Sequence, residues 1–183
     1  TKAIKYSKCC FISSDGFRMV LPRKYNYVNI HNIDAGSFVY PNEQIMKDNK
    51  EIPIMVSYVG LFVEREHMLK AINFFANDKR FIFNIWGYSE NDGDNDALKD
   101  YIASKKILNV HLMGRFSRED KIDIYNETDL LLYYYESKFR YRYATANKYY
   151  DSLFYAVPCI VNKKTTIGSQ MAKDGLGIPV ALT

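Results

Sequence analysis

Residues 54–86, with the sequence IMVSYVGLFVEREHMLKAINFFANDKRFIFNIW, contain two strand-like runs separated by a helical pattern. Residues 54–59 and 81–86 are apolar and aromatic nearly throughout, which is typical of strands that are covered on both faces. The apolar residues between them recur at the spacing of one helix face: Met68, Ala71, Ile72 and Phe75. The stretch therefore predicts a strand, a crossover helix and a second, parallel strand.

The same alternation continues to the end of the chain. Four more runs have strand length and composition: residues 110–113, 129–134, 159–161 and 178–181. Four more helical segments lie between them: one starting at Asp94 or Asn95, then residues 118–127, 147–155 and 165–173. This pattern predicts an α/β fold: a Rossmann-like parallel sheet of about six strands with helices on both faces.

Residues 1–51 have a different character. They hold two short strand-like runs at 9–13 and 25–30 and a short helical stretch at 15–21. The polar stretch 34–51 then leads into the alternating region and is expected to be a linker. We therefore divide the chain into residues 1–51 and a Rossmann-like domain over residues 52–183.

Composition excludes several classes of protein. The chain has 183 residues, of which 48% are hydrophobic and 25% charged, unlike a disordered chain. Its net charge of +4 is small for a dedicated nucleic-acid binder. Apolar runs are all shorter than the roughly 18 residues of a membrane span. The three cysteines, two of them adjacent, indicate a reduced, intracellular chain without a disulfide framework.

Familiar site motifs are missing. The acidic tract 91–96 lacks the glycine and glutamate of a calcium loop, since Ala97 and Ala103 occupy those positions. We expect a helix N-cap in a solvated loop there instead. The sequence has neither GxGxxG nor GxxxxGK[ST], and His31, His67 and His111 show no metal-ligand spacing. No metal site is predicted.

Residues 133–155, YYYESKFRYRYATANKYYDSLFY, mix aromatic residues with the cations Lys138, Arg140, Arg142 and Lys148. The plainest interpretation is a strand, a polar loop and an amphipathic helix. Single-stranded nucleic-acid binding would use the same residue types, but the RNP1 pattern is absent. A third interpretation places the helix start, near residues 146–147, at the carboxyl edge of the sheet, where its dipole would favour a diphosphate. The first and third interpretations remain open from the residues alone.

The segment Asn147-Lys148-x-x-Asp151-x-x-x-x-Ala156-x-Pro158-x-Ile160 resembles the donor-domain signature of GT-B glycosyltransferases, especially those of bacterial capsule and lipopolysaccharide assembly. Five further pieces resemble that domain in the same order: Tyr58-Val59-Gly60, residues 81–87, Asn109-Val110-x-Leu112-x-Gly114, Ile124-Tyr125-x-x-Thr128-Asp129-Leu130 and Gly175-x-Gly177-x-Pro179-Val180. The family has two Rossmann-like domains that face a cleft. The C-terminal domain binds a nucleotide diphosphate sugar, and the N-terminal domain binds the acceptor.

Residues 9–17 and His31-Asn32 resemble the close of the acceptor domain. The resemblance thus implies that residues 1–51 are the end of a preceding acceptor domain and its linker. It also implies that residues 52–183 are the donor domain, truncated at its C-terminal end.

The resemblance implies a set of donor-binding residues. Asp151 would hold the ribose hydroxyls, Lys148 would add charge beside the diphosphate, and Gly60 would approach the diphosphate from the other side. Thr145, Ala146 and Asn147 would present backbone N–H groups to the diphosphate, and Arg65 would add a cation beside a phosphate. Gly114, Arg115 and Phe116 would border the base. Tyr143 and Arg142 would lie near the sugar.

Three departures from the family pattern concern this site. Tyr143 stands where many retaining members have the first of two glutamates. Many members also have an arginine right after the opening glycine and a lysine five residues further on. Leu61 stands at the first position and Arg65 or Glu66 at the second, so Arg65 is the expected substitute. Ala156 replaces a common glycine. No catalytic residue is assigned, and any general base would come from the preceding domain.

The sequence therefore predicts the donor-binding half of a glycosyltransferase that acts in surface polysaccharide synthesis. Its partners would be the nucleotide-sugar donor, the acceptor domain and a sugar or lipid-linked acceptor, without nucleic acid, cofactor or metal. The expected location is cytoplasmic, with a peripheral contact of the full-length enzyme at the inner membrane face left open. Residues 1–183 alone are expected to bind nucleotide weakly and to transfer nothing. The alternatives are a non-catalytic Rossmann-like regulatory domain and a sugar-nucleotide epimerase of the same fold.

Overall fold

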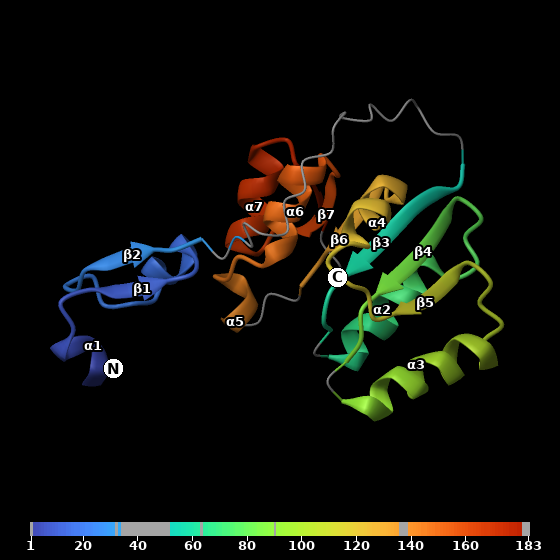
Figure 1. Ribbon diagram of the computed structural model, residues 1–183, viewed down its shortest axis with the longest axis horizontal. Coiled ribbons are helices and arrows are strands. Elements are labelled where there is room, and N and C mark those ends of the chain that lie inside the picture. Colours follow the sequence, from blue (N-terminus) through green and yellow to red (C-terminus); the bar gives the residue numbers. More distant parts are fainter. Residues whose placement is uncertain are drawn as a thin grey trace.

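The computed structural model describes residues 2–31, 33, 52–62, 64–89, 91–135 and 139–180. A six-stranded sheet with the strand order β5-β4-β3-β6-β7-β8 forms its larger part (Figure 1). The strands are β3 (Ile54–Val59), β4 (Phe81–Trp86), β5 (Val110–Gly114), β6 (Leu130–Tyr133), β7 (Cys159–Asn162) and β8 (Gly177–Val180). Every neighbouring pair in this sheet is parallel. The predicted α/β fold with a six-stranded parallel sheet is confirmed.

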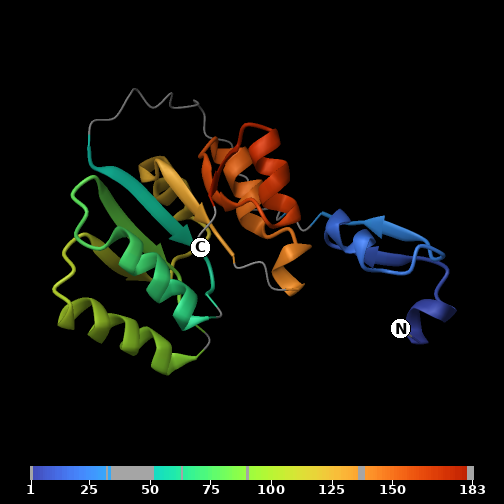
Figure 2. The same cartoon turned by 180° about the vertical axis from the view of Figure 1, so that it is seen from behind.

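Helices pack on both faces of the sheet, as Figures 1 and 2 show from opposite sides. They are α2 (Arg65–Phe75), α3 (Asp92–Ser104), α4 (Lys121–Glu127), α5 (Phe139–Arg142), α6 (Asn147–Tyr155) and α7 (Thr166–Lys173). Among the described residues, no helix is both long and apolar enough to cross a membrane.

Alternation along each strand sends neighbouring side chains to opposite faces, and this builds two cores. Val56 and Tyr58 of β3 join the buried apolar residues of α2 and α3. Val59 joins the other cluster, with buried residues of α4 and α7 such as Tyr125 and Met171. Both cores lie between sheet and helices, so the carboxyl edge of the sheet is left for loops and helix starts.

Three local predictions need correction. Helix α5 lies in a stretch that was expected to be a loop. The sequence did not predict this helix because a single turn of four residues leaves no periodic pattern. Helix α3 starts at Asp92, slightly earlier than expected. Helix α4 starts at Lys121 and not at residue 118, although Ser117 and Asp120 exchange the predicted capping hydrogen bonds, of 2.7 and 3.3 Å.

Residues 2–31 contain a small separate sheet that lies beside α5 and α6 (Figures 1 and 2). Its elements are α1 (Lys2–Tyr6), β1 (Cys10–Ile12), the 3-10 helix η1 (Asp15–Met19) and β2 (Tyr27–Asn29). Strands β1 and β2 are parallel, and they lie within the predicted runs 9–13 and 25–30. The predicted linker, residues 34–51, lies outside the described residues.

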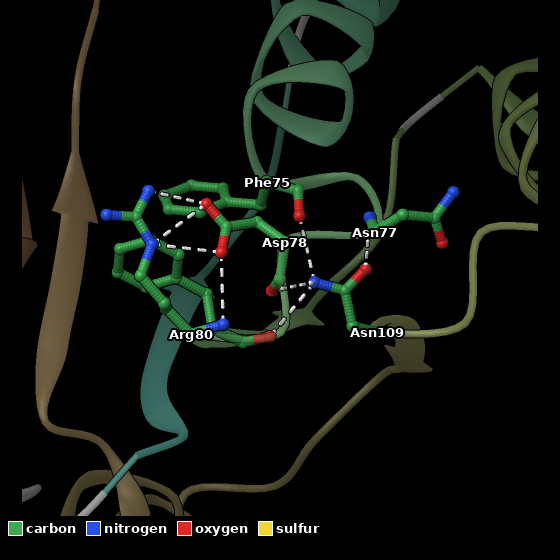
Figure 3. Close-up of polar contacts among 6 residues, drawn as sticks. Phe75, Asn77, Asp78, Arg80 and Asn109 are labelled. Atoms are coloured by element: carbon green, nitrogen blue, oxygen red, sulfur yellow. Dashed lines mark hydrogen bonds and ion pairs between the residues drawn. The ribbon is translucent and has the colours of Figure 1, made fainter.

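At the amino edge of the large sheet, Asn109 closes the turn between α2 and β4 (Figure 3). Its Nδ2 donates to the carbonyl oxygens of Phe75, Asp78 and Phe81 at 2.8, 3.0 and 2.9 Å. Its Oδ1 accepts from the backbone N–H of Asn77 at 2.7 Å. Asn109, which the family resemblance singled out, is therefore a structural clamp at the edge opposite the carboxyl ends of the strands.

Candidate functional site

Three adjacent strands end in glycine at the carboxyl edge. Gly60 follows β3, Gly87 follows β4 and Gly114 ends β5, with φ angles of 126°, 133° and 80°. These values lie where residues with a Cβ are strained, so only glycine lets all three strands turn off here. The backbones are joined by hydrogen bonds from Gly60 N to Trp86 O, 2.8 Å, and from Gly87 N to Gly114 O, 2.7 Å.

Close packing of the backbone adds a second constraint at Gly87. A Cβ on this residue would overlap the carbonyl group of Gly60. Of the three glycines at this edge, Gly60 and Gly87 have other protein atoms where a side chain would stand, whereas Gly114 has open space there. In open α/β sheets, ligands bind at this edge.

Lys148, in the first turn of α6, sends its ammonium group to this edge. The side chain is buried, and its Nζ donates to the hydroxyl of Tyr135 at 3.1 Å. Nζ lies 4.2 Å from the centre of the Tyr58 ring and 5.5 Å from that of Tyr135. A Cβ on Gly60 would come within 3.3 Å of the same Nζ, so the charge lies directly beside the glycine turn.

No carboxylate in the described part of the chain forms an ion pair with Lys148. A buried charge is costly unless it is paired, and aromatic faces and one hydroxyl compensate only part of that cost. Burial raises the pKa of Tyr135, but the neighbouring Lys148 ammonium outweighs it and holds the pKa below its ordinary value. The site is therefore locally electropositive and suited to an anion.

Asp151, one turn further along α6, is also buried. Its Oδ2 accepts from the hydroxyl of Tyr125 at 2.8 Å, and its Oδ1 lies 3.2 Å from the ammonium of Lys121. Burial and the Asp151 charge together raise the pKa of Tyr125, so that hydroxyl keeps its proton. The carboxylate is thus held in one orientation by two neighbouring donors, and its two oxygens still have lone pairs for further donors.

The turn before α6 is held from two sides. The backbone N–H of Ala146 donates to the hydroxyl of Tyr133 at 2.8 Å, so this amide is already used within the protein. The hydroxyl of Thr145 donates to Ser14 Oγ at 3.0 Å. The backbone of Tyr143 packs against Gly16. Two of the predicted ligand residues therefore face the N-terminal segment.

No protein-family model matches the sequence, and no curated protein matches it. Solved structures do match. A sucrose-phosphate synthase from Thermosynechococcus elongatus superposes with a TM-score of 0.72 at 13% identity, over 98% of this chain and 46% of that chain. The lipopolysaccharide outer core galactosyltransferase WaaB gives 0.62 at 13% identity, over 93% and 47%. The pneumococcal O-GlcNAc transferase GtfA, solved with UDP and GlcNAc, gives 0.61 at 17% identity, over 99% and 35%.

The chain has the fold of one GT-B glycosyltransferase domain. It spans about half the length, or less, of the solved chains that it matches.

The residues predicted to border the base lie at the end of β5 and directly after it. The guanidinium of Arg115 stacks on the ring of Tyr88, 3.5 Å from its centre, and Tyr88 itself follows Gly87. Phe116 is partly buried against the core on the α4 side. The stack of the exposed Arg115 on the half-buried Tyr88 therefore stands at the carboxyl edges of β4 and β5.

Other predicted site residues are less closely associated with Lys148. Arg65, at the start of α2, pairs with Asp94 of α3 at 3.5 Å and is half exposed. Arg142 of α5 and Asn147 are exposed. Lys138 and the side chain of Arg140 lie outside the described residues.

Four residues that sequence reasoning did not assign to the site contact its two charged members. Tyr58 and Tyr135 enclose the Lys148 ammonium, and Lys121 and Tyr125 hold Asp151. The spacing of Lys121 and Tyr125, four residues apart on α4, was a usable signal, because such residues share a helix face. No local pattern links Tyr58 with Lys148, since the contact depends on the sheet topology.

Proposed function

We propose that this chain is the donor-binding half of a glycosyltransferase that moves a sugar from a nucleotide diphosphate sugar to a hydroxyl acceptor. In the reaction, the bond between the anomeric carbon and the diphosphate breaks, and a bond from that carbon to the acceptor oxygen forms. The nucleoside diphosphate leaves and the acceptor hydroxyl loses its proton. The work of this half is to hold the donor and to stabilise the charge that develops on the diphosphate.

The single observation that carries the proposal is the buried Lys148 ammonium beside Gly60. A desolvated cation whose described partners are two aromatic rings and one hydroxyl attracts a diphosphate strongly. Its position at the carboxyl edge of a parallel sheet is where such folds bind nucleotides.

Asp151 provides a second anchor. Lys148 and Asp151 are three residues apart on α6, a spacing that brings both to one side of the helix. With the diphosphate beside Lys148, we assign Asp151 to the ribose, whose hydroxyls donate to a carboxylate. Lys121 and Tyr125 then serve as positioning residues for that carboxylate.

We further propose that residues 1–51 belong to the preceding acceptor-binding half. The parallel pair β1–β2 supports this assignment, because parallel sheets are normally covered on both faces and a two-stranded sheet is marginal on its own. Phe11 and Val28 are register partners on one face of the pair, and their side chains are 70% and 47% exposed. The acceptor half would cover this face and supply any general base.

The likeness to the lipopolysaccharide galactosyltransferase favours a role in surface polysaccharide synthesis. The acceptor would then be a sugar or a lipid-linked sugar, handled on the cytoplasmic side of the membrane. We propose no cofactor or metal, and the donor is treated as a substrate.

Calorimetric titration of the chain with UDP, GDP and CMP tests the proposal. We expect one nucleoside diphosphate to bind, and Lys148→Met to weaken that binding about 10- to 100-fold, because methionine fills similar space without charge. Lys99→Met, on the exposed surface of α3, is the matched control and should bind like the wild type. Absence of binding for all three nucleotides would favour a non-catalytic regulatory domain.

A further inference from the structure

The start of α6 is held by three contacts from residues 2–31, the N-terminal segment. Figures 1 and 2 show this segment beside α5 and α6. His31 Nδ1 lies 2.7 Å from the hydroxyl of Tyr150, and their rings meet edge to face. Ser14 Oγ accepts the 3.0 Å hydrogen bond from Thr145. Gly16 packs against the backbone of Tyr143.

The contact at Gly16 requires the absence of a side chain. A Cβ on this residue would overlap the Tyr143 carbonyl oxygen and lie 3.0 Å from its Cα. Gly16 is buried, and its N–H donates to Ser14 Oγ at 3.2 Å, so the same hydroxyl joins both contacts. The two backbones therefore lie in close contact, and a side chain at residue 16 would have to push them apart.

The segment held in this way, residues 143–150, carries Lys148. Tyr133 fixes it from the sheet side through the amide of Ala146, and Tyr135 fixes the Lys148 ammonium. The N-terminal segment contacts it at residues 143, 145 and 150, which flank the lysine on both sides. The position of the ammonium thus depends on the sheet and on the N-terminal segment together.

We propose that Ser14, Gly16 and His31 are positioning residues for the anion site at Lys148, so that donor affinity depends on how the N-terminal segment packs against α6. This inference rests on the proposed function for its ligand, though not for its structural part. Where residues 1–51 belong to the acceptor half, the same contacts couple the placement of that half to donor binding. A site with this coupling binds its donor best when the two halves have the correct relative arrangement.

The test uses three variants of the full chain: Gly16→Val, which forces the backbones apart, and Ser14→Ala and His31→Phe, which each remove a polar contact. Ser14→Thr keeps the hydroxyl and should restore wild-type behaviour. Met19→Ala, at an η1 side chain that is 72% exposed, is the control for nonspecific effects in the segment. Each variant is measured by amide hydrogen exchange over residues 143–150 and by titration with the nucleoside diphosphate that the wild type binds.

We expect faster exchange over residues 143–150 in the three variants, with exchange in α2 and α3 unchanged. Nucleotide affinity should fall about three- to tenfold for each polar variant, the usual consequence of losing one hydrogen bond. Unchanged exchange over residues 143–150 would overturn the inference whether or not the chain binds nucleotide. Faster exchange with unchanged nucleotide affinity would also overturn the inference. Failure of the wild type to bind any nucleotide would overturn the proposed function, and the exchange result alone would then decide whether the N-terminal segment holds residues 143–150.

Discussion

The Lys148 ammonium lies 4.2 Å from the centre of the Tyr58 ring, although the two residues belong to opposite faces of the sheet. Tyr58 belongs to the core on the α2 side, whereas Lys148 comes from α6, whose Tyr149 and Tyr155 pack against the other core. The lysine side chain therefore reaches around the carboxyl edge of β3, beside the turn at Gly60. This placement puts a positive charge where the strands end.

Tyr135 should titrate at a lower pH than the exposed tyrosines. Its pKa lies below the ordinary value because the Lys148 ammonium outweighs the effect of burial. The stability gained by ionising this tyrosine is present above its unfolded pKa and is lost as the pH falls through the folded pKa. Titration of tyrosinate absorbance should show an early step that disappears in Tyr135→Phe.

Lys148→Met provides the reciprocal control for that titration. With the charge removed, burial is the largest influence left on Tyr135 and outweighs its interaction with the Tyr58 hydroxyl, so its pKa should rise above the ordinary value. An early step that persists in this variant would mean that another group lowers the pKa.

Gly87→Ala should destabilise the domain by about 2–3 kcal/mol, because the new Cβ meets the Gly60 carbonyl and the φ of 133° disfavours any side chain. Urea unfolding measures this cost. Gly93→Ala is the matched control, since a Cβ there meets no atom within 4 Å in helix α3, and it should stabilise by about 0.5–1 kcal/mol. Equal stabilities for the two variants would refute the close-packed glycine edge.

Asn109→Ala should lower the free energy of unfolding by about 2–3 kcal/mol, because three carbonyl groups lose their shared donor. Asn126→Ala, at an exposed position on α4, should change stability by less than about 0.5 kcal/mol. Nucleotide affinity of the folded Asn109→Ala protein should match the wild type, since the clamp lies at the opposite edge of the sheet. A loss of affinity would place Asn109 in the site.

Much of the fold was predictable because its signals are local. The runs 54–59 and 81–86 became β3 and β4 with unchanged bounds, and the stripe of Met68, Ala71, Ile72 and Phe75 is the buried face of α2. The single-turn α5 was missed because four residues carry no helical period. Helix α4 started late because a capping signal fixes hydrogen bonds without fixing the first helical residue.

The site was predictable only in part, for a physical reason. Lys148 and Gly60 stand in sequence motifs, and the parallel topology brings them together at the carboxyl edge of β3. The enclosure of Lys148 by Tyr58 and Tyr135 depends on which strands are neighbours in the sheet. The contact between Thr145 and Ser14 joins residues 131 positions apart, and nothing in either segment signals the other.

Asp151→Ala should destabilise the domain by about 3–5 kcal/mol, because it leaves the ammonium of Lys121, whose side chain is only 17% exposed, without its ion-pair partner. Thermal or urea unfolding measures this loss. Adding Lys121→Met should recover most of the stability and should not recover nucleotide binding. Recovery of both would show that Asp151 serves only the fold.

The most direct test of the anion site compares a nucleoside diphosphate with its monophosphate, each titrated into the wild type and Lys148→Met. We predict that the substitution weakens diphosphate binding about 10- to 100-fold, the effect of one hydrogen bond to a charged group, and leaves monophosphate binding nearly unchanged. Loss of the β-phosphate and loss of the ammonium should therefore be non-additive. An equal effect on both ligands, or none on either, would contradict a diphosphate site at Lys148.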